Sequence, residues 1–209
     1  MTDSYLTVAR DGEAEIEVKR SRFLCTLARV EDETAARAVV DRLRKQHWAA
    51  RHHCSAFVLG PEGAVERSSD DGEPAGTAGA PMLEVLRGRG VSDVVAVVTR
   101  WFGGTLLGAG GLVRAYGDAV RAGLDVTGTL RRDLVRELTL ELGHADAGRV
   151  ESELRARGVA VLDTTYAGHV TLRLGVPTAE VDRLHAMVAE LTGGTAAAVP
   201  AGERWVDRS

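Results

Sequence analysis

The sequence is poor in aromatic residues, which make up 4% of its 209 residues. With so few rings, we do not expect a broad platform on which nucleic-acid bases stack. It also has only two cysteines, Cys25 and Cys54, which lie in apolar segments and form no Cys-x-x-Cys pair. This excludes a disulfide framework and favours buried, reduced thiols.

Long apolar runs are missing too. No segment approaches the roughly 18 consecutive apolar residues of a membrane-spanning helix, and the N-terminal stretch lacks the apolar core of a signal peptide. The formal net charge is −4 and the pI about 5.9, which excludes nucleic-acid binding by bulk charge but is compatible with a local basic face. We therefore expect a cytoplasmic protein with no membrane partner.

Standard catalytic motifs are absent. Gly103 and Gly108 have the spacing of a P-loop, but Ala109 and Gly110 stand where lysine and serine or threonine are needed. This argues against ordinary hydrolysis of nucleoside triphosphates. The dinucleotide fingerprint fails because Val113 occupies the place of its third glycine, and neither G-x-S-x-G nor H-E-x-x-H occurs.

The patterning that is present predicts an α/β (α+β) protein with two domains, 1–130 and 131–209, joined near residues 125–136. A β-branched run at 94–102 is typical of a central strand buried on both faces. In the first domain we also expect strands and helices at 21–30, after Asp32, at 54–60, from about Pro81, and at 112–124. The second domain shows the order βαββαβ of a ferredoxin-like fold.

A glycine-rich stretch, RWFGGTLLGAGGLVRAYG at residues 100–117, connects the buried strand to the next helix. Such a turn exposes backbone N–H groups and the positive end of the helix dipole, and Arg100 and Arg114 add positive charge, so one interpretation is an anion-binding site. The alternative is that the glycines allow close packing and positive φ angles. The candidates are Gly103, Gly104, Gly108, Gly110 and Gly111.

A second polar stretch, SSDDGEPAGTAG at residues 68–79, leads into the helix expected at Pro81. Its carboxylates, Asp70, Asp71 and Glu73, fall within four residues. One interpretation is a Mg²⁺ site that shares its metal with a phosphate, and the alternative is a solvated acidic turn. Three further candidates precede the helix: Gly76, Thr77 and Gly79.

The segment RHHC at residues 51–54 suggests either a zinc site or a cysteine nucleophile with a histidine base. Adjacent strand residues point to opposite faces, so His53 and Cys54 are not expected to meet, and no second pair of metal ligands follows. His52 or His53 could instead line a pocket as a hydrogen-bonding group, and we retain His53 as the candidate. A structural histidine is the alternative.

Four blocks of the chain, in order, resemble the YigZ/IMPACT family. They are KRSRF, ARHHCSAFVLG, RSSDDGEPAGTAGAPMLEVL and VVAVVTRWFGGTLLGAGGLVRAYGDAV, and they extend from Lys19 to Val120. The chain departs from the family pattern at Trp101, where tyrosine is common, and at Leu106, where lysine is common. Losing that lysine weakens an anion-binding role for the tip of the loop.

The resemblance implies an N-terminal domain like the second domain of a small-subunit ribosomal protein, a fold shared with elongation factor G and the GHMP kinases. The C-terminal half is similar to a C-terminal domain of elongation factor G. Eukaryotic members of the family act in translational control, binding the activator of the amino-acid-starvation kinase. They carry a different accessory domain, so that partner does not transfer. The family supplies no established catalytic residue.

Together these features predict a translation-linked regulatory protein, rather than an enzyme, that binds RNA, the ribosome or a protein partner through its glycine-rich N-terminal face. One alternative is a Mg²⁺-dependent enzyme that handles phosphate or nucleotide, with Asp70, Asp71 and Glu73 on the metal and Arg100 and Arg114 on the phosphate. Another is a nucleotide-sensing module. In each case we expect two helix N-termini to point into a concave corner between the two loops.

Overall fold

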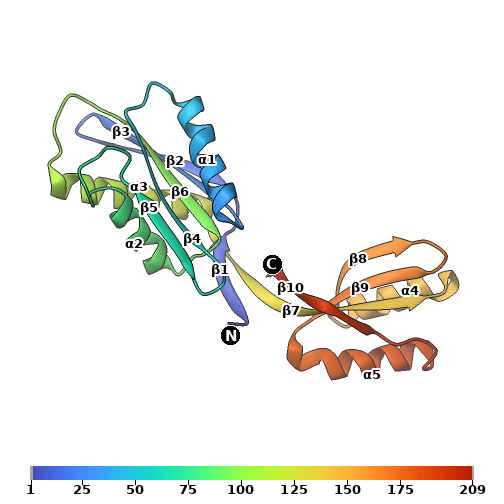
Figure 1. The fold of residues 1–209 in the computed structure, drawn as a ribbon. Coiled ribbons are helices and arrows are strands. Elements are labelled where there is room, and N and C mark those ends of the chain that lie inside the picture. The colour runs from blue at the N-terminus through green and yellow to red at the C-terminus, as the bar shows by residue number, and fades with distance from the viewer. Residues whose placement is uncertain (1, 209) are drawn as a thin grey trace. The chain divides into compact units, whose positions relative to one another are not determined.

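A computed structural model describes residues 2–208, which form two compact units, 2–132 and 133–208 (Figure 1). The N-terminal unit contains a five-stranded sheet in the order β2-β3-β6-β4-β5, and every neighbouring pair is antiparallel. Its strands are β2 (Gly12–Val18), β3 (Ser21–Arg29), β4 (His52–Leu59), β5 (Val65–Ser69) and β6 (Val94–Trp101).

The central strand β6 confirms the expectation of burial on both faces. Residues 94–100 are all buried, and alternate side chains enter two separate cores. Val95 and Val97 pack with α1 (Glu33–Gln46) on one face of the sheet. Val94, Ala96 and Val98 pack on the other face with α2 (Gly79–Arg89) and α3 (Ala109–Thr127). The unit is therefore a sheet between two layers of helix (Figure 1).

The helix boundaries follow local chemistry. The Asp32 carboxylate accepts a hydrogen bond from the Ala35 N–H at 2.7 Å, which confirms it as the cap of α1. Gly90, with φ of 65°, ends α2 in the left-handed conformation. The helix α3 is longer than the predicted 112–124, because it begins within the glycine stretch and continues to Thr127, with Gly128 as its C-cap.

The C-terminal unit has the predicted βαββαβ order. Its strands pair in the order β10-β7-β9-β8, which places the first strand between the third and the fourth as in ferredoxin-like domains. The elements are β7 (Thr129–Leu142), α4 (His144–Ala156), β8 (Ala160–Tyr166), β9 (Val170–Val176), α5 (Val181–Thr192) and β10 (Val199–Arg208). A short 3₁₀ turn, Thr178–Glu180, precedes α5. The predicted fold class of two α/β domains in series is confirmed.

Three strands were not predicted from the sequence: β2, β5 and β1 (Ser4–Val8), which pairs with β7. The division between the two units, after Arg132, falls within the expected joining segment 125–136, which contains the end of α3 at Thr127 and the first residues of β7. Among the described residues, no helix combines the length and apolarity that a membrane span requires.

Candidate functional site

The glycine-rich stretch and the acidic loop meet in the N-terminal unit, where they enclose a cavity of about 340 Å³. We call it the α3 cavity, because the first residues of α3 form one wall. The other walls come from the start of β4, the acidic loop and the end of β6. Its lining residues are Arg51, His52, Gly72, Glu73, Pro74, Arg100, Phe102, Leu106, Leu107, Gly108, Ala109 and Leu112.

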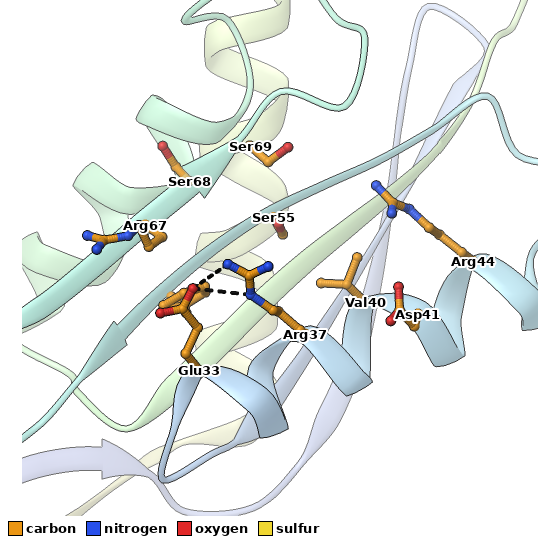
Figure 2. A pocket seen from close by; sticks show the side chains of 10 residues that line it. Glu33, Arg37, Val40, Asp41, Arg44, Ser55, Arg67, Ser68 and Ser69 are labelled. Carbon is orange, nitrogen blue, oxygen red and sulfur yellow. Dashed lines mark hydrogen bonds and ion pairs between the residues drawn. The ribbon is translucent and has the colours of Figure 1, made fainter.

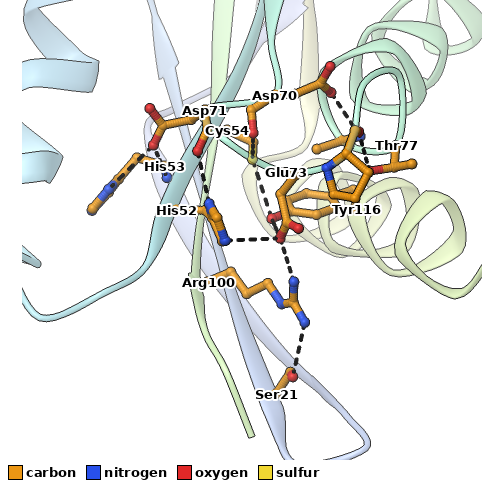
Figure 3. Close-up of polar contacts among 12 residues, drawn as sticks. Ser21, His52, His53, Cys54, Asp70, Asp71, Glu73, Thr77, Arg100 and Tyr116 are labelled. Atoms are coloured by element: carbon orange, nitrogen blue, oxygen red, sulfur yellow. Dashed lines mark hydrogen bonds and ion pairs between the residues drawn. The ribbon is translucent and has the colours of Figure 1, made fainter. Parts of the chain in front are cut away.

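A buried ion pair forms the polar wall of this cavity. Nη1 of Arg100 lies 2.5 Å from Oε1 of Glu73, and the two side chains are only 7% and 4% exposed. The Tyr116 hydroxyl donates to the same Oε1 at 2.8 Å (Figure 3). Nη2 of Arg100 lies 3.5 Å from the Ser21 hydroxyl. Glu73 therefore joins β6, α3 and the acidic loop through charge-assisted hydrogen bonds.

His52 also lines the cavity, with its ring held in one orientation. Its Nδ1 lies 2.8 Å from the Asp71 carbonyl oxygen, and because a carbonyl oxygen only accepts, this hydrogen bond requires the N–H on Nδ1. Nε2 then faces Glu73 at 3.9 Å and, in the neutral ring, can accept a hydrogen bond from a ligand.

The sequence candidate His53 lies elsewhere. It pairs with Thr99 across the β4–β6 ladder, whereas His52 pairs with Arg100, so the two histidines point to opposite faces of the sheet. Burial lowers the pKa of His53, and its Nε2 has no hydrogen-bond partner among the described residues. The histidine at the cavity is therefore His52, which the sequence could not distinguish from its neighbour.

The three carboxylates of the acidic loop do not converge. Asp70 accepts backbone N–H bonds from Gly76 at 2.8 Å, Ala78 at 3.0 Å and Gly79 at 2.8 Å, and so caps α2. Burial favours a higher pKa for Asp70, but these donors outweigh it and hold the pKa below its ordinary value. The N-terminus of α2 is thus occupied by the protein's own carboxylate and, contrary to our expectation, does not open into the cavity.

Asp71 also has its own partners. One of its oxygens lies 2.6 Å from Nη2 of Arg44, and the other accepts the His53 N–H at 2.7 Å. These contacts hold Asp71 at a φ of 43°, which is unusual for a residue other than glycine. Within residues 2–208, no group of three His, Cys, Asp or Glu side chains is arranged to hold a metal ion. The geometry gives the Mg²⁺ interpretation of this loop no support.

The other candidates in the acidic loop shape its backbone. Gly76 has a φ of 75°, and the Thr77 hydroxyl donates to the Pro74 carbonyl at 2.7 Å. A side chain at Gly79 would lie 2.7 Å from the backbone of Ser69, which is too close for any Cβ. These residues therefore keep the loop compact and let α2 approach β5.

The glycines of the glycine-rich stretch are of two kinds: some are required by close packing or a positive φ angle, and others have open space around them. A Cβ at Gly103 would lie 2.1 Å from the backbone of Arg20, so only glycine fits there. Gly104 and Gly108 have φ angles of 86° and 75°. Apart from its chain neighbours and the backbone of its own helix, a Cβ at Gly110 would have no atom within 4 Å, and one at Gly111 would lie 3.1 Å from the Cβ of Leu107. Packing and conformation explain Gly103, Gly104 and Gly108 but not Gly110.

The two arginines of the stretch do not act together. Arg100 is buried at the α3 cavity, whereas Arg114 lines a separate groove between α2 and α3 with Glu84, Arg89 and Arg121. The N-cap of α3 is Gly108, which has no side chain to cap the helix, and Gly108 and Ala109 line the cavity. An anion in the cavity would therefore meet this helix N-terminus, Arg51 and Arg100, but not Arg114.

An exposed aromatic ring with an arginine against it lies at the cavity and was not among the sequence candidates. The guanidinium of Arg51 lies 5.8 Å from the centroid of the Phe102 ring, which is 41% exposed. The Arg22 guanidinium lies 4.8 Å from the Trp101 ring, but on the face of the sheet that α1 covers, because these residues alternate with Phe23 and Arg100. Leu106, which lines the cavity, is 82% exposed. The low aromatic content argued against a broad stacking platform, but composition does not say where the few rings lie.

The buried thiol of Cys54 belongs to the same network and is expected to be inert. Its Sγ lies 3.0 Å from the Asp70 carbonyl and 3.3 Å from the Tyr116 hydroxyl, and burial raises its pKa to about 12. Burial also raises the pKa of Cys25 to about 12. At about pH 8 we expect the folded chain to release almost no chromophore from a thiol-specific disulfide reagent, because the reactive thiolate is not populated. In denaturant both thiols should react, and rapid reaction of one thiol in the folded chain would contradict this assignment.

Comparison with known proteins places the chain in a family. The family model described as the Impact N-terminal domain matches residues 19–124, and a second, described as a domain of unknown function (DUF1949), matches residues 140–195. The IMPACT family member YvyE of Bacillus subtilis is 43% identical over 93% of this chain and 89% of its own length. The IMPACT family member YigZ of Escherichia coli is 40% identical over 92% of this chain and 96% of its own length.

More distant relatives and a solved structure agree. The protein IMPACT homolog of Saccharomyces cerevisiae is 35% identical over 50% of this chain and 43% of its own length. A crystal structure described as that of a hypothetical protein superposes with a TM-score of 0.66 at 38% identity, covering 96% of this chain and 98% of that one. This chain therefore belongs to the IMPACT family.

Proposed function

We propose that this protein is a translation-linked regulator that binds single-stranded RNA at the α3 cavity. The observation that carries the proposal is the placement of Phe102 and Arg51, a partly exposed ring with a guanidinium against it, at the mouth of a cavity with an arginine in its wall. Proteins that bind single strands combine such rings, on which bases stack, with positive charge along the backbone path.

The dimensions of the site favour a single strand over a duplex. A volume of 340 Å³ is at the lower end of the range of about 300 to 1,000 Å³ for small-ligand pockets. Such a cavity can admit one unstacked base but not a helix. Recognition of unpaired bases on aromatic side chains is also the usual route to RNA specificity.

The charge distribution makes the binding local. The net charge of −4 disfavours RNA over most of the surface, so attraction must come from the arginines beside the cavity. Of these, Arg51 is exposed, whereas Arg100 is buried and paired with Glu73. The resemblance to a family with members in translational control supports a regulatory rather than a catalytic role.

Fluorescence anisotropy with labelled single-stranded and duplex RNA, at low and physiological salt, tests the proposal. We expect the single strand to bind at physiological salt and Phe102→Leu to weaken it about 5- to 100-fold, the loss expected when one stacked base is removed. Arg51→Gln should reduce the slope of log affinity against log salt by about 0.7.

Two substitutions control for loss of a ring and loss of a charge. Tyr166 is 70% exposed in the C-terminal unit, so Tyr166→Leu removes an exposed ring far along the chain from the site. Arg42 is exposed on α1 and does not line the α3 cavity, so Arg42→Gln removes an arginine charge outside the site. Binding seen only at low salt, or weakened equally by Phe102→Leu and Tyr166→Leu, would contradict the RNA proposal and favour a protein partner.

A further inference from the structure

We propose that a second cavity, on the opposite face of the N-terminal sheet, binds a nucleoside monophosphate. This cavity, the α1 groove, lies between α1 and strands β4 and β5 and has a volume of about 380 Å³. Figure 2 shows its two walls, with Arg37 and Arg44 on the helix and Arg67 on the strand. The proposal is independent of RNA binding at the α3 cavity.

The groove exists because α1 covers only part of its face of the sheet. The helix packs on β4 and β6, and the edge strand β5 lies beyond it. Along β4, Phe57 and Leu59 point into the core under α1, whereas Ser55, two residues earlier on the same face, lines the groove. The hydrophobic pattern of the strand is therefore interrupted by a hydroxyl where the groove begins.

The polar groups of the floor and wall have unused hydrogen-bonding capacity. Ser55 pairs with Ser69 across the β4–β5 ladder, which puts two hydroxyls side by side. Among the described residues, no hydrogen bond is recorded for the Ser55 hydroxyl. Arg67 donates one, from Nη1 to the Glu66 carbonyl at 2.9 Å, although a guanidinium has five N–H donors. A ligand with several acceptor oxygens would satisfy these groups.

The signs of the charges in the groove narrow the ligand class. Arg37 pairs with Glu33 at 2.5 Å and Arg44 with Asp71 at 2.6 Å, so both guanidinium groups are held in place, while the two side chains remain 73% and 47% exposed. Guanidinium groups match the oxygens of phosphate, which they bind with two parallel hydrogen bonds. The lining therefore favours a phosphate group over an uncharged ligand.

Two carboxylates in the groove limit the number of phosphate groups that a bound ligand can carry. Glu33 and Asp41 line it opposite the strands, so the lining residues carry one net positive charge, and Asp71, outside the lining, already pairs with Arg44. A polyphosphate or an RNA backbone would meet repulsion from these carboxylates. Hydroxyl or amino groups, such as those of a ribose or a base, would instead donate to them. One phosphate attached to a polar nucleoside satisfies both sides of the groove.

Isothermal titration of the full chain with AMP, GMP, CMP and UMP tests the proposal, with inorganic phosphate and adenosine as partial ligands. We expect at least one monophosphate to bind more tightly than phosphate or the nucleoside. Arg67→Gln and Arg37→Gln should each weaken it about tenfold or more, since each removes a charge-assisted hydrogen bond. Arg42→Gln removes the same charge from α1 outside the groove and should leave the affinity unchanged.

The outcomes separate this site from the RNA site. Phe102→Leu should not change nucleotide affinity, and Arg67→Gln should not change RNA affinity. If Phe102→Leu rather than Arg67→Gln abolishes nucleotide binding, the ligand occupies the α3 cavity and the proposal is wrong. No saturable binding of any monophosphate at millimolar concentration overturns it as well. Displacement of the nucleotide by a short 5′-phosphorylated RNA, but not by its unphosphorylated form, would identify an RNA end as the source of the phosphate.

Discussion

Replacing Glu73 with alanine is expected to lower the free energy of unfolding by about 3 to 5 kcal/mol, the usual effect of removing one partner of a buried ion pair. The variant leaves the Arg100 guanidinium, whose side chain is 7% exposed, without its carboxylate. The Tyr116 hydroxyl loses its acceptor at the same time. Urea denaturation followed by circular dichroism measures the change as a shift of the transition midpoint.

Two further variants test whether the lower stability of Glu73→Ala comes from loss of the ion pair. Glu73→Gln keeps an acceptor for the Tyr116 hydroxyl but removes the charge, so its stability should lie between those of the wild type and Glu73→Ala. Glu84, exposed on α2, provides a matched control, and Glu84→Ala should change stability by no more than about 0.5 kcal/mol. If Glu73→Ala changes the free energy of unfolding as little as Glu84→Ala does, then water solvates the Arg100 charge or another group pairs with it. The Glu73–Arg100 ion pair would then not be needed for stability.

Alanine at Gly103 should be destabilising by about 3 kcal/mol or more, at the upper end of what overpacking produces. The added methyl would lie 2.1 Å from the carbonyl carbon and oxygen of Arg20, and backbone atoms cannot rotate away as the end of a side chain can. The β6 end and the β2–β3 turn would have to separate. Thermal or urea unfolding of the purified variant measures the loss.

Gly110 is the matched comparison, seven residues along the same stretch. A Cβ there has no neighbour within 4 Å, and the residue lies in the first turn of α3. Gly110→Ala should therefore stabilise the protein by up to about 1 kcal/mol, because alanine has the higher helix propensity. Equal stability of the two variants would show that the loop moves to accept Gly103→Ala. Weaker RNA binding by a stable Gly110→Ala would mean that the ligand approaches the backbone at Gly110.

Local patterns were reliable where a residue acts on its immediate neighbours. Asp32 caps α1, Gly193 ends α5 with a φ of 60°, and the β-branched run forms the central strand. The strand β2 was missed although Ala14, Ile16 and Val18 alternate in it, because its glutamates resemble a polar terminus. Its identity as a strand comes from pairing with β3, which is a contact between segments.

The candidate site was predicted in part. Both loops do meet at one cavity, and Arg100, Glu73 and Gly108 line it as the two-loop hypothesis requires. His52, and not the candidate His53, lines this cavity, and the sequence does not say which face of β4 turns toward α3. The metal interpretation of Asp70 and Asp71 depended on proximity in sequence, but backbone N–H groups and Arg44 engage these carboxylates separately.

The sequence by itself determined the two-domain α/β order, the family and the two loops that carry the candidate residues. These features are encoded in periodicity, capping and motifs, each of which acts over a few residues of chain. Only the tertiary structure decided that Glu73 neutralises Arg100, that Asp70 fills the N-terminus of α2, and that Phe102 and Arg51 meet at the mouth of the α3 cavity. Each of these contacts joins residues at least six and up to 51 positions apart, and a buried charge or an N–H group binds whichever partner the packed chain brings within about 3 Å.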